Sequence, residues 1–276
     1  MRVRVHSEND VFQQLVSLAT NRRKRHQAKR CLVEGVKPIN LAIANGWAIE
    51  GLVYAQDAQL SGWAKGVIAS SGAKTHYELA PHLMEALSDK EETSELIAVV
   101  ATPGDDLSRI RLGRVPLLVV LDQPSSPGNL GSIIRSCDAL GVDGVAVLGH
   151  SADIYDPQTI RASLGTVFSL PVVRLGSMSQ TLQWFESLKA AYPGFKVFGT
   201  SAKADADLAD ADLTGPAVLV FGNETRGMSC NLREACDLIL RIPISGSASS
   251  LNLACAASIV LYEADRQRRK QEIRTS

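Results

Sequence analysis

The chain has 276 residues, and 45% of them are hydrophobic. At about 150 residues per domain this length predicts two domains, and the apolar fraction excludes a disordered or fibrous protein. Lys and Arg together number 29, as do Asp and Glu, so the formal net charge is zero. No overall field draws such a chain to nucleic acid, and a nucleic-acid site must come from a local basic cluster.

Neither a membrane span nor a metal site is expected. Aliphatic runs such as 117–121 are far shorter than the roughly 20 residues that cross a bilayer, and the start MRVRVHSEND has no signal-peptide core. The five cysteines form no C-x-x-C pair and are odd in number, which argues against a disulfide framework and against zinc. We therefore expect a soluble, cytoplasmic protein without a metal.

In chain order, the first part alternates short strand patterns with helical ones, which predicts a small α/β domain over residues 1–105. The predicted strands are 31–34, 49–55 and 96–100, and the predicted helices are 36–45 and 81–87. The next segment, 102–116, is rich in Pro, Gly and charge, which is typical of a linker.

The second predicted domain covers residues 106–276. Its predicted strands are 117–121, 144–148, 196–200, 217–221 and 238–242, and its helices include 130–140 and 181–191. Alternation of strands and helices predicts an α/β fold with a mainly parallel sheet that is covered on both faces.

Three polar segments follow predicted strands of this sheet, and the first is PSSPGNLGSIIR, residues 124–135. Two prolines fix a turn, and Asn129 is placed to cap a helix that begins at Leu130. Arg135 shares one helical face with Gly131 and Asp138 and projects beside the loop. The alternative is a capped surface helix with a solvated arginine.

The second segment runs from a strand into Gly222, Asn223 and Glu224, and the next helix is expected near Ser229. Gly222 would let the backbone approach a ligand closely, and Glu224 brings a carboxylate to the sheet edge. The alternative is an ordinary turn with glycine at both ends.

The third segment leaves a strand at Ile242, crosses a Gly and Ser loop, and enters a helix of about twenty residues near Ser250. Ser249 or Ser250 is the expected N-cap, which places Asn252 in the first helical turn. Ordinary capping is again the alternative.

Open α/β sheets bind ligands where their strands end, so the three segments together predict one site. No G-x-G-x-x-G follows a strand, which argues against a dinucleotide fingerprint. In order and wording the segments resemble the three motifs of the SpoU-type (SPOUT superfamily) RNA ribose 2′-O-methyltransferases. The similarity covers about residues 115–263. It implies S-adenosylmethionine as the methyl donor, a trefoil-knotted C-terminal domain and a homodimer.

The resemblance also implies roles for individual residues. The residues that match catalytic and substrate-contacting positions are Asn129, Arg135, Glu224, Ser250 and Asn252. The residues that match the cofactor cleft are Thr200, Gly222, Asn223, Ile242 and Leu251. The third motif departs from the usual S-L-N-V-S at Leu253 and Ala254, so the last hydroxyl of the motif is absent. The full-length pattern looks closest to the avilamycin-resistance type of 23S ribosomal RNA methyltransferase.

The implied reaction moves a methyl group from a sulfonium to a ribose oxygen. The sulfonium charge disappears in the transition state, so a water-poor cleft favours the reaction. The resemblance implies that Arg135 is the general base, yet a guanidinium normally stays protonated. Two hypotheses therefore stand. Either desolvation and substrate phosphate neutralise Arg135 and it takes the proton, or Arg135 stays charged and stabilises the developing alkoxide while another group or water takes the proton.

A basic block near the N-terminus is the candidate RNA contact. It contains Arg22, Arg23, Lys24, Arg25, Lys29 and Arg30. Such a block can neutralise several phosphates, although a solvated basic helix is the alternative. The resemblance implies an RNA-binding domain similar to kink-turn-binding ribosomal proteins, with 23S ribosomal RNA as substrate. Transfer RNA as substrate, and a non-catalytic RNA-binding protein with a vestigial cofactor cleft, remain as alternatives.

Overall fold

The computed structural model describes residues 1–88 and 92–275, without the side chains of 272, 274 and 275. The chain forms two compact units. Unit 1 comprises Met1–Gly104 and Asp153–Ser169, and unit 2 comprises Asp105–Ala152 and Leu170–Ser276. The first change of unit lies one residue before the predicted boundary. The assignment of Asp153–Ser169 to unit 1 was not predicted.

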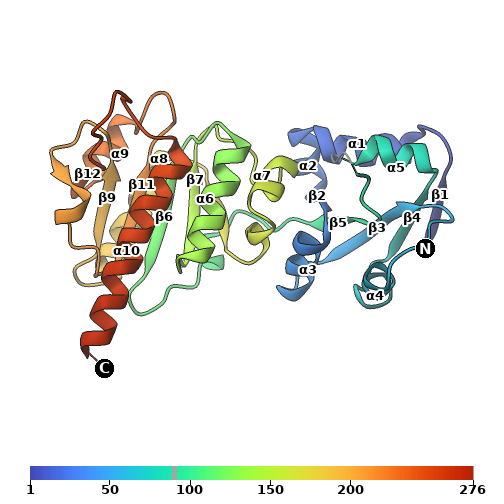
Figure 1. Ribbon diagram of the computed structural model, residues 1–276, viewed down its shortest axis with the longest axis horizontal. Coiled ribbons are helices and arrows are strands. Elements are labelled where there is room, and N and C mark those ends of the chain that lie inside the picture. Colours follow the sequence, from blue (N-terminus) through green and yellow to red (C-terminus); the bar gives the residue numbers. More distant parts are fainter. Residues whose placement is uncertain (89–91, 276) are drawn as a thin grey trace. The chain divides into compact units, whose positions relative to one another are not determined.

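Unit 1 contains a five-stranded mixed sheet in the order β1-β4-β3-β5-β2 (Figure 1). Its strands are β1 (Arg2–Val5), β2 (Arg30–Glu34), β3 (Ile49–Ala55), β4 (Thr75–Leu79) and β5 (Ile97–Ala101). β1, β4 and β3 are parallel neighbours, whereas β5 runs antiparallel to both β3 and β2. The predicted strands of this unit are confirmed to within one residue.

Helices cover both faces of this sheet (Figure 1). They are α1 (Asp10–Thr20), α2 (Arg22–Ala28), α3 (Val36–Ala44), α4 (Gly62–Ser70), α5 (Pro81–Leu87), α7 (Pro157–Ala162) and the 3₁₀ turn η2 (Thr166–Phe168). α1 and α5 pack Phe12, Leu15 and Leu83 against Val53 and Val99 of the sheet. These contacts make the core of unit 1.

The segment that carries α7 and η2 packs tightly against the rest of unit 1. α7 contacts β2, and η2 contacts α3. The Trp47 indole N–H donates to the carbonyl of Phe168 at 2.8 Å, and the two rings meet edge to face with centroids 5.0 Å apart. Gly165 has φ +84°, and a Cβ there would lie 2.5 Å from Pro38 Cα. Only glycine fits this close approach.

Unit 2 contains a seven-stranded sheet in the order β10-β12-β9-β11-β6-β7-β8. Its strands are β6 (Leu117–Asp122), β7 (Gly144–Leu148), β8 (Val172–Leu175), β9 (Lys196–Thr200), β10 (Ala206–Asp207), β11 (Ala217–Phe221) and β12 (Leu238–Arg241). Every neighbouring pair is parallel, which confirms the predicted parallel α/β sheet.

Two helical layers bury this sheet (Figure 1). The helices of unit 2 are η1 (Leu107–Arg109), α6 (Pro127–Ala139), α8 (Met178–Ala191), η3 (Leu208–Asp210), α9 (Cys230–Ala235) and α10 (Leu253–Thr275). One sheet face, with Val120 and Val218, packs on Phe185 of α8 and Leu232 of α9. α6 and α10 lie side by side on the other face (Figure 1). Among the described helices, none is long and apolar enough to cross a membrane.

The predicted linker at 102–116 is more ordered than its composition indicates. Ile110 is 7% exposed and belongs to the core of unit 2. A Cβ on Gly144 would come within 2.6 Å of the Ile110 side chain, so this glycine leaves room for it. The Asp143 carboxylate accepts the N–H groups of Gly113 and Leu117. Buried apolar contact and capped backbone groups therefore fix the segment.

Candidate functional site

The three polar segments lie at one edge of the unit 2 sheet. They follow β6, β11 and β12, and the sheet order places β12, β9, β11 and β6 next to one another. All of these strands are parallel, so their carboxyl ends meet at the same edge. The predicted convergence of the segments is confirmed as geometry.

The Glu224 carboxylate joins the second segment to the first. It accepts hydrogen bonds from the Ser125 N–H at 3.0 Å, the Ser125 hydroxyl at 2.8 Å, the Ser126 N–H at 3.3 Å and the Asn129 amide at 3.0 Å. These donors lie at the N-terminus of α6, where free N–H groups and the helix dipole favour an anion. Partial burial raises the pKa of Glu224, but hydrogen bonds from Asn129 and Ser125 outweigh it and lower the pKa to about 2. Glu224 is therefore a carboxylate throughout the physiological pH range.

Asn129 joins Glu224 to the third segment. Its amide nitrogen faces the carboxylate, and its oxygen accepts from the Asn252 amide nitrogen at 3.0 Å. The Asn252 oxygen in turn accepts the N–H groups of Ala254 and Cys255. A carboxylate accepts only, so it fixes the orientation of Asn129, which then fixes that of Asn252. One polar chain thus links all three segments.

Two predicted helix caps are wrong by a few residues. α6 begins at Pro127, and its N-cap is Ser126, whose hydroxyl accepts the Asn129 N–H at 3.3 Å. α10 begins at Leu253, and Asn252 caps it, instead of Ser249 or Ser250. Because Asn129 and Asn252 occupy helix starts, their side chains meet at the sheet edge.

The other two predicted catalytic residues are outside this polar chain. Arg135 lies on α6 six residues after Asn129, about 9 Å along the helix axis at 1.5 Å per residue. Arg135 and Ser250 are both exposed, and neither side chain has a hydrogen bond or ion pair with any described residue. Both side chains are therefore free to meet a ligand, and their roles stay predictions.

The predicted cofactor residues differ in what they offer. The Thr200 hydroxyl donates to the Val220 carbonyl at 3.1 Å, which leaves its oxygen able to accept. Ile242 is half-buried, and Leu251 is 38% exposed despite its apolar side chain. Thr200 ends β9 and Ile242 follows β12, whereas Leu251 directly precedes Asn252 of the polar chain.

Gly222 and Asn223 both stabilise the loop after β11, which was not predicted from the sequence. A Cβ on Gly222 would lie 2.2 Å from backbone atoms of Gly227 and Met228, so the protein's own chain requires a glycine here. The Asn223 amide donates to the Gln123 carbonyl at 2.7 Å and accepts the N–H groups two and three residues ahead. The side chain of Asn223 therefore holds the loop, and its role at the cofactor stays a prediction.

The sequence analysis missed three residues of this edge. Ser125 and Ser126 supply three of the five hydrogen bonds that the Glu224 carboxylate accepts from Ser125, Ser126, Asn129 and Asn223. Asp122 is 2% exposed, and its carboxylate accepts the Ser229 N–H at 2.7 Å, which ties the end of β6 to the start of α9. The signal available for Asp122 was a carboxylate at the end of a fully apolar strand.

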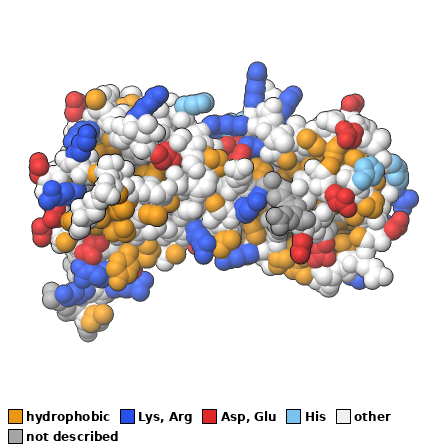
Figure 2. Space-filling model, turned by 45° about the horizontal axis from the view of Figure 1, so that its top comes forward, with side chains coloured by type: hydrophobic (Ala, Val, Ile, Leu, Met, Phe, Trp, Pro, Cys, Tyr) orange, Lys and Arg blue, Asp and Glu red, His pale blue; other side chains and the backbone are white. Residues whose placement is uncertain are grey.

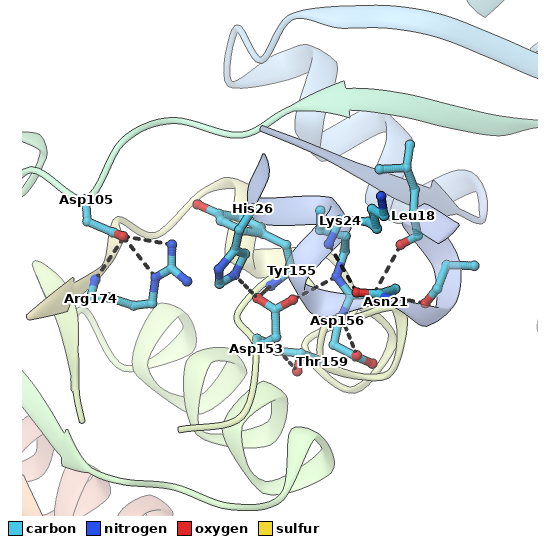
Figure 3. Close-up of polar contacts among 12 residues, drawn as sticks. Leu18, Asn21, Lys24, His26, Asp105, Asp153, Tyr155, Asp156, Thr159 and Arg174 are labelled. Carbon is cyan, nitrogen blue, oxygen red and sulfur yellow. Dashed lines mark hydrogen bonds and ion pairs between the residues drawn. The ribbon is translucent and has the colours of Figure 1, made fainter. Parts of the chain in front are cut away.

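The predicted RNA-binding block coincides with α2 and its flanks, and Arg25 must be removed from it. Arg25 is 2% exposed and makes 2.7 Å ion pairs with Asp153 and Asp156, both labelled in Figure 3. Its guanidinium also donates to the carbonyls of Leu18 and Ala19. A buried guanidinium with four acceptors is not available to RNA phosphate.

The remaining members of the block face outward. Arg23, Lys24, Lys29 and Arg30 are exposed, and Arg22 is half-buried. Lys and Arg side chains project from the surface near α2 in Figure 2. Arg30 is paired with Glu50, which partly neutralises it. The block thus offers a smaller basic surface than six cations would.

Comparison with known proteins adds independent findings. The SpoU rRNA Methylase family matches residues 116–262, and the SpoU L30e-like domain matches residues 9–98. A 23S rRNA (uridine(2479)-2′-O)-methyltransferase of Streptomyces viridochromogenes is 46% identical over 266 residues, covering 96% of this chain and 92% of that protein.

Solved structures resemble both units. The SpoU methyltransferase AviRb of Streptomyces viridochromogenes, in complex with the cofactor AdoMet, matches with a TM-score of 0.89 and 46% identity, covering 95% of this chain and 98% of that one. An AdoMet-bound rRNA methyltransferase of Sinorhizobium meliloti matches with a TM-score of 0.83 and 29% identity, covering 96% and 98%.

Proposed function

Because this chain belongs to the SpoU rRNA Methylase family, we propose that it transfers a methyl group from S-adenosylmethionine to a ribose 2′-hydroxyl of 23S ribosomal RNA. The observation that carries the proposal is the polar chain of Glu224, Asn129 and Asn252, which unites the three motifs at the sheet edge. Similarity along nearly the full length to a 23S rRNA 2′-O-methyltransferase supports the choice of RNA.

The two units divide the work in this proposal. The match of residues 9–98 to the SpoU L30e-like domain supports substrate binding by residues 1–105. The catalytic domain, residues 106–276, holds the donor. An enzyme that modifies ribosomal RNA acts where ribosomes are assembled, so a cytoplasmic location follows from the proposal.

The residues of unit 2 fit the donor. Bound S-adenosylmethionine supplies an electrophilic methyl group on a sulfonium. The exposed apolar side chain of Leu251 and half-buried Ile242 can exclude water from that group, which favours loss of charge in the transition state. The Thr200 hydroxyl can accept a hydrogen bond from the donor's polar part.

Arg135 and Ser250 serve the RNA side of the reaction. Arg135 is exposed and has no partner among the described residues, so nothing in the free protein neutralises its charge. We therefore favour the second hypothesis, in which Arg135 stays charged and stabilises the developing alkoxide while water or another group takes the proton of the 2′-hydroxyl. A pH-rate profile of Arg135→Lys separates the two: a modest loss at every pH agrees with charge stabilisation, and a shifted profile contradicts it.

Assembly into a homodimer is part of the proposal. Ile259 and Tyr262, three residues apart on α10, are 40% and 59% exposed, and they form an apolar pair on one helical face. A second copy covering this face would remove the pair from water. Light scattering at micromolar concentration tests this, and a monomer would contradict it. The trefoil knot likewise remains a prediction.

The decisive experiment measures transfer of labelled methyl from S-adenosylmethionine to unmodified 23S RNA and, separately, to transfer RNA. We expect incorporation into 23S RNA that makes one linkage resistant to alkali and that is lost in Arg135→Ala. Incorporation into transfer RNA alone would change the substrate. Failure to bind the donor and to methylate either RNA would favour a non-catalytic RNA-binding protein.

A further inference from the structure

Unit 1 contains a groove whose lining includes no residue of the three motifs. It has a volume of about 650 Å³, which falls within the roughly 300–1,000 Å³ of ligand pockets. α1, α2 and the sheet form its walls. Its lining includes Leu15, Leu18, Val99, Tyr77, Gln14 and Gln27.

The inner part of the groove is apolar and aromatic. Leu15, Leu18 and Val99 are between 3% and 7% exposed and belong to the core of the unit. Tyr77 of β4 packs against this core but remains half-exposed, so part of its ring is accessible from the groove. An aromatic ring beside an aliphatic floor suits a flat ligand that stacks.

The rim carries polar groups without partners. The side chains of Gln14 and Gln27 make no hydrogen bond with any described residue, and both are exposed. Lys24 has no ion pair among the residues described, although its backbone N–H is used by Asn21. Each amide offers donors and an acceptor in one plane, which matches the edge of a nucleobase.

We propose that this groove binds one unpaired nucleotide of the RNA substrate, with the base stacked on Tyr77 and read by Gln14 and Gln27. The inference rests on the proposed function, and it specifies how unit 1 recognises RNA. Sequence-specific RNA recognition favours unstacked bases that meet aromatic rings and polar side chains. Lys24 at the rim binds the phosphate beside that nucleotide.

Charge within the groove agrees with this occupant. The negative charge of Asp10 offsets the positive charge of Lys24, and Arg30 is already paired with Glu50. The lining therefore has little excess positive charge. A free polyanion therefore gains little inside the groove. A neutral base inside it, with phosphates at the basic rim of α2, matches the distribution of charge.

The test compares the full chain with Gln14→Ala/Gln27→Ala, with Lys24→Ala and with Tyr77→Leu, using unmodified 23S RNA. Binding is measured by filter retention over a range of salt concentrations. Gln59→Ala and Lys65→Ala change exposed residues elsewhere in unit 1 and serve as matched controls. Thermal denaturation confirms that each variant folds, and Tyr77→Phe keeps the ring if Tyr77→Leu does not fold.

We expect the double glutamine variant to bind at least fivefold more weakly at every salt concentration, because hydrogen bonds to a base do not release counterions. Lys24→Ala should lower the salt slope by about one. Tyr77→Leu should weaken binding about tenfold, and Tyr77→Phe should bind like the parent.

If the parent methylates RNA and the double glutamine variant binds RNA as tightly as the parent, the groove is not a nucleotide site. Loss of activity on ribosomal particles with normal binding to naked RNA would also overturn it, in favour of a protein partner. A parent that neither binds nor methylates any RNA would instead refute the proposed function.

Discussion

Replacement of Glu224 by glutamine tests the polar chain most directly. The two carboxylate oxygens of Glu224 share five donors: Oε2 accepts from the N–H and hydroxyl of Ser125 and from the Asn223 amide, and Oε1 accepts from the Ser126 N–H and the Asn129 amide. A glutamine keeps one oxygen and directs an NH₂ group at the donors of the other oxygen. At least two hydrogen bonds are therefore lost, and the new NH₂ group faces N–H or O–H groups that are themselves donors.

The expected magnitude follows from the lowered pKa. A fall from 4.5 to about 2 corresponds to about 3.5 kcal/mol at about 1.4 kcal/mol per unit. Glu224 is exposed, so screening by solvent reduces this by about half, and we expect Glu224→Gln to cost about 1–2 kcal/mol at pH 7. A depressed pKa stabilises the fold above pH 4.5 and loses that effect as pH falls towards 2. The difference between parent and variant should therefore shrink with acid.

Urea denaturation at pH 7 and near pH 3 measures this difference, and Glu234→Gln, an exposed residue of α9, is the matched control. The reasoning is refuted if Glu224→Gln is as stable at pH 7 as the control variant. It is equally refuted if the difference in stability between parent and Glu224→Gln is as large near pH 3 as at pH 7.

Three further variants test other parts of the structure. Gly222→Ala should destabilise unit 2 by about 3 kcal/mol in thermal denaturation, since its Cβ would lie 2.2 Å from backbone atoms; a neutral effect would contradict the close approach. Arg25→Met should cost about 3–5 kcal/mol, because it leaves buried Asp153 without its cation, and a second change of Asp153→Asn should recover part of that loss. Asn252→Asp should keep the cap of α10 but remove the amide donor to Asn129, so its methyl transfer should fall at unchanged stability, whereas Asn252→Ala should lose about 1 kcal/mol as well.

The parallel sheet could be predicted because its strands are short apolar runs that alternate with helices. Strands such as β7, β9 and β11 begin and end where the pattern places them. The convergence of the motifs followed, because parallel strands present their carboxyl ends at one edge. Residues that act just after a strand are therefore accessible to sequence reasoning.

Helix caps were harder to predict, because several good capping residues stand together. In the first motif Ser125, Ser126 and Asn129 are all capable caps, and only the tertiary donors to Glu224 decide between them. The bond from Asn223 to the Gln123 carbonyl was not predicted for the same reason, since these residues are 100 positions apart in sequence. Such long-range hydrogen bonds leave no local pattern.

The burial of Arg25 was not predictable from a dense run of basic residues. A run of this kind reads as a solvated surface, and one inward-facing position within a seven-residue helix leaves no clear period. Its partners Asp153 and Asp156 come from a segment 128 and 131 residues later. A local run of charges shows only its own members, whereas the folded chain pairs Arg25 with carboxylates that are far away in sequence.

The path of the chain limits how this protein can be divided. The backbone passes from one unit to the other after residues 104, 152 and 169, so no single cut yields two intact halves. A fragment ending at 105 would expose the surface of unit 1 that α7 covers. It would also leave Arg25 without the carboxylates of Asp153 and Asp156. A fragment starting at 106 would carry Ile154 and Phe168, which are at most 2% exposed in the whole chain, without the surface that shields them. A chimaera with a related protein should therefore take residues 153–169 from the same parent as residues 1–104. We expect chimaeras that divide these segments between two parents to aggregate.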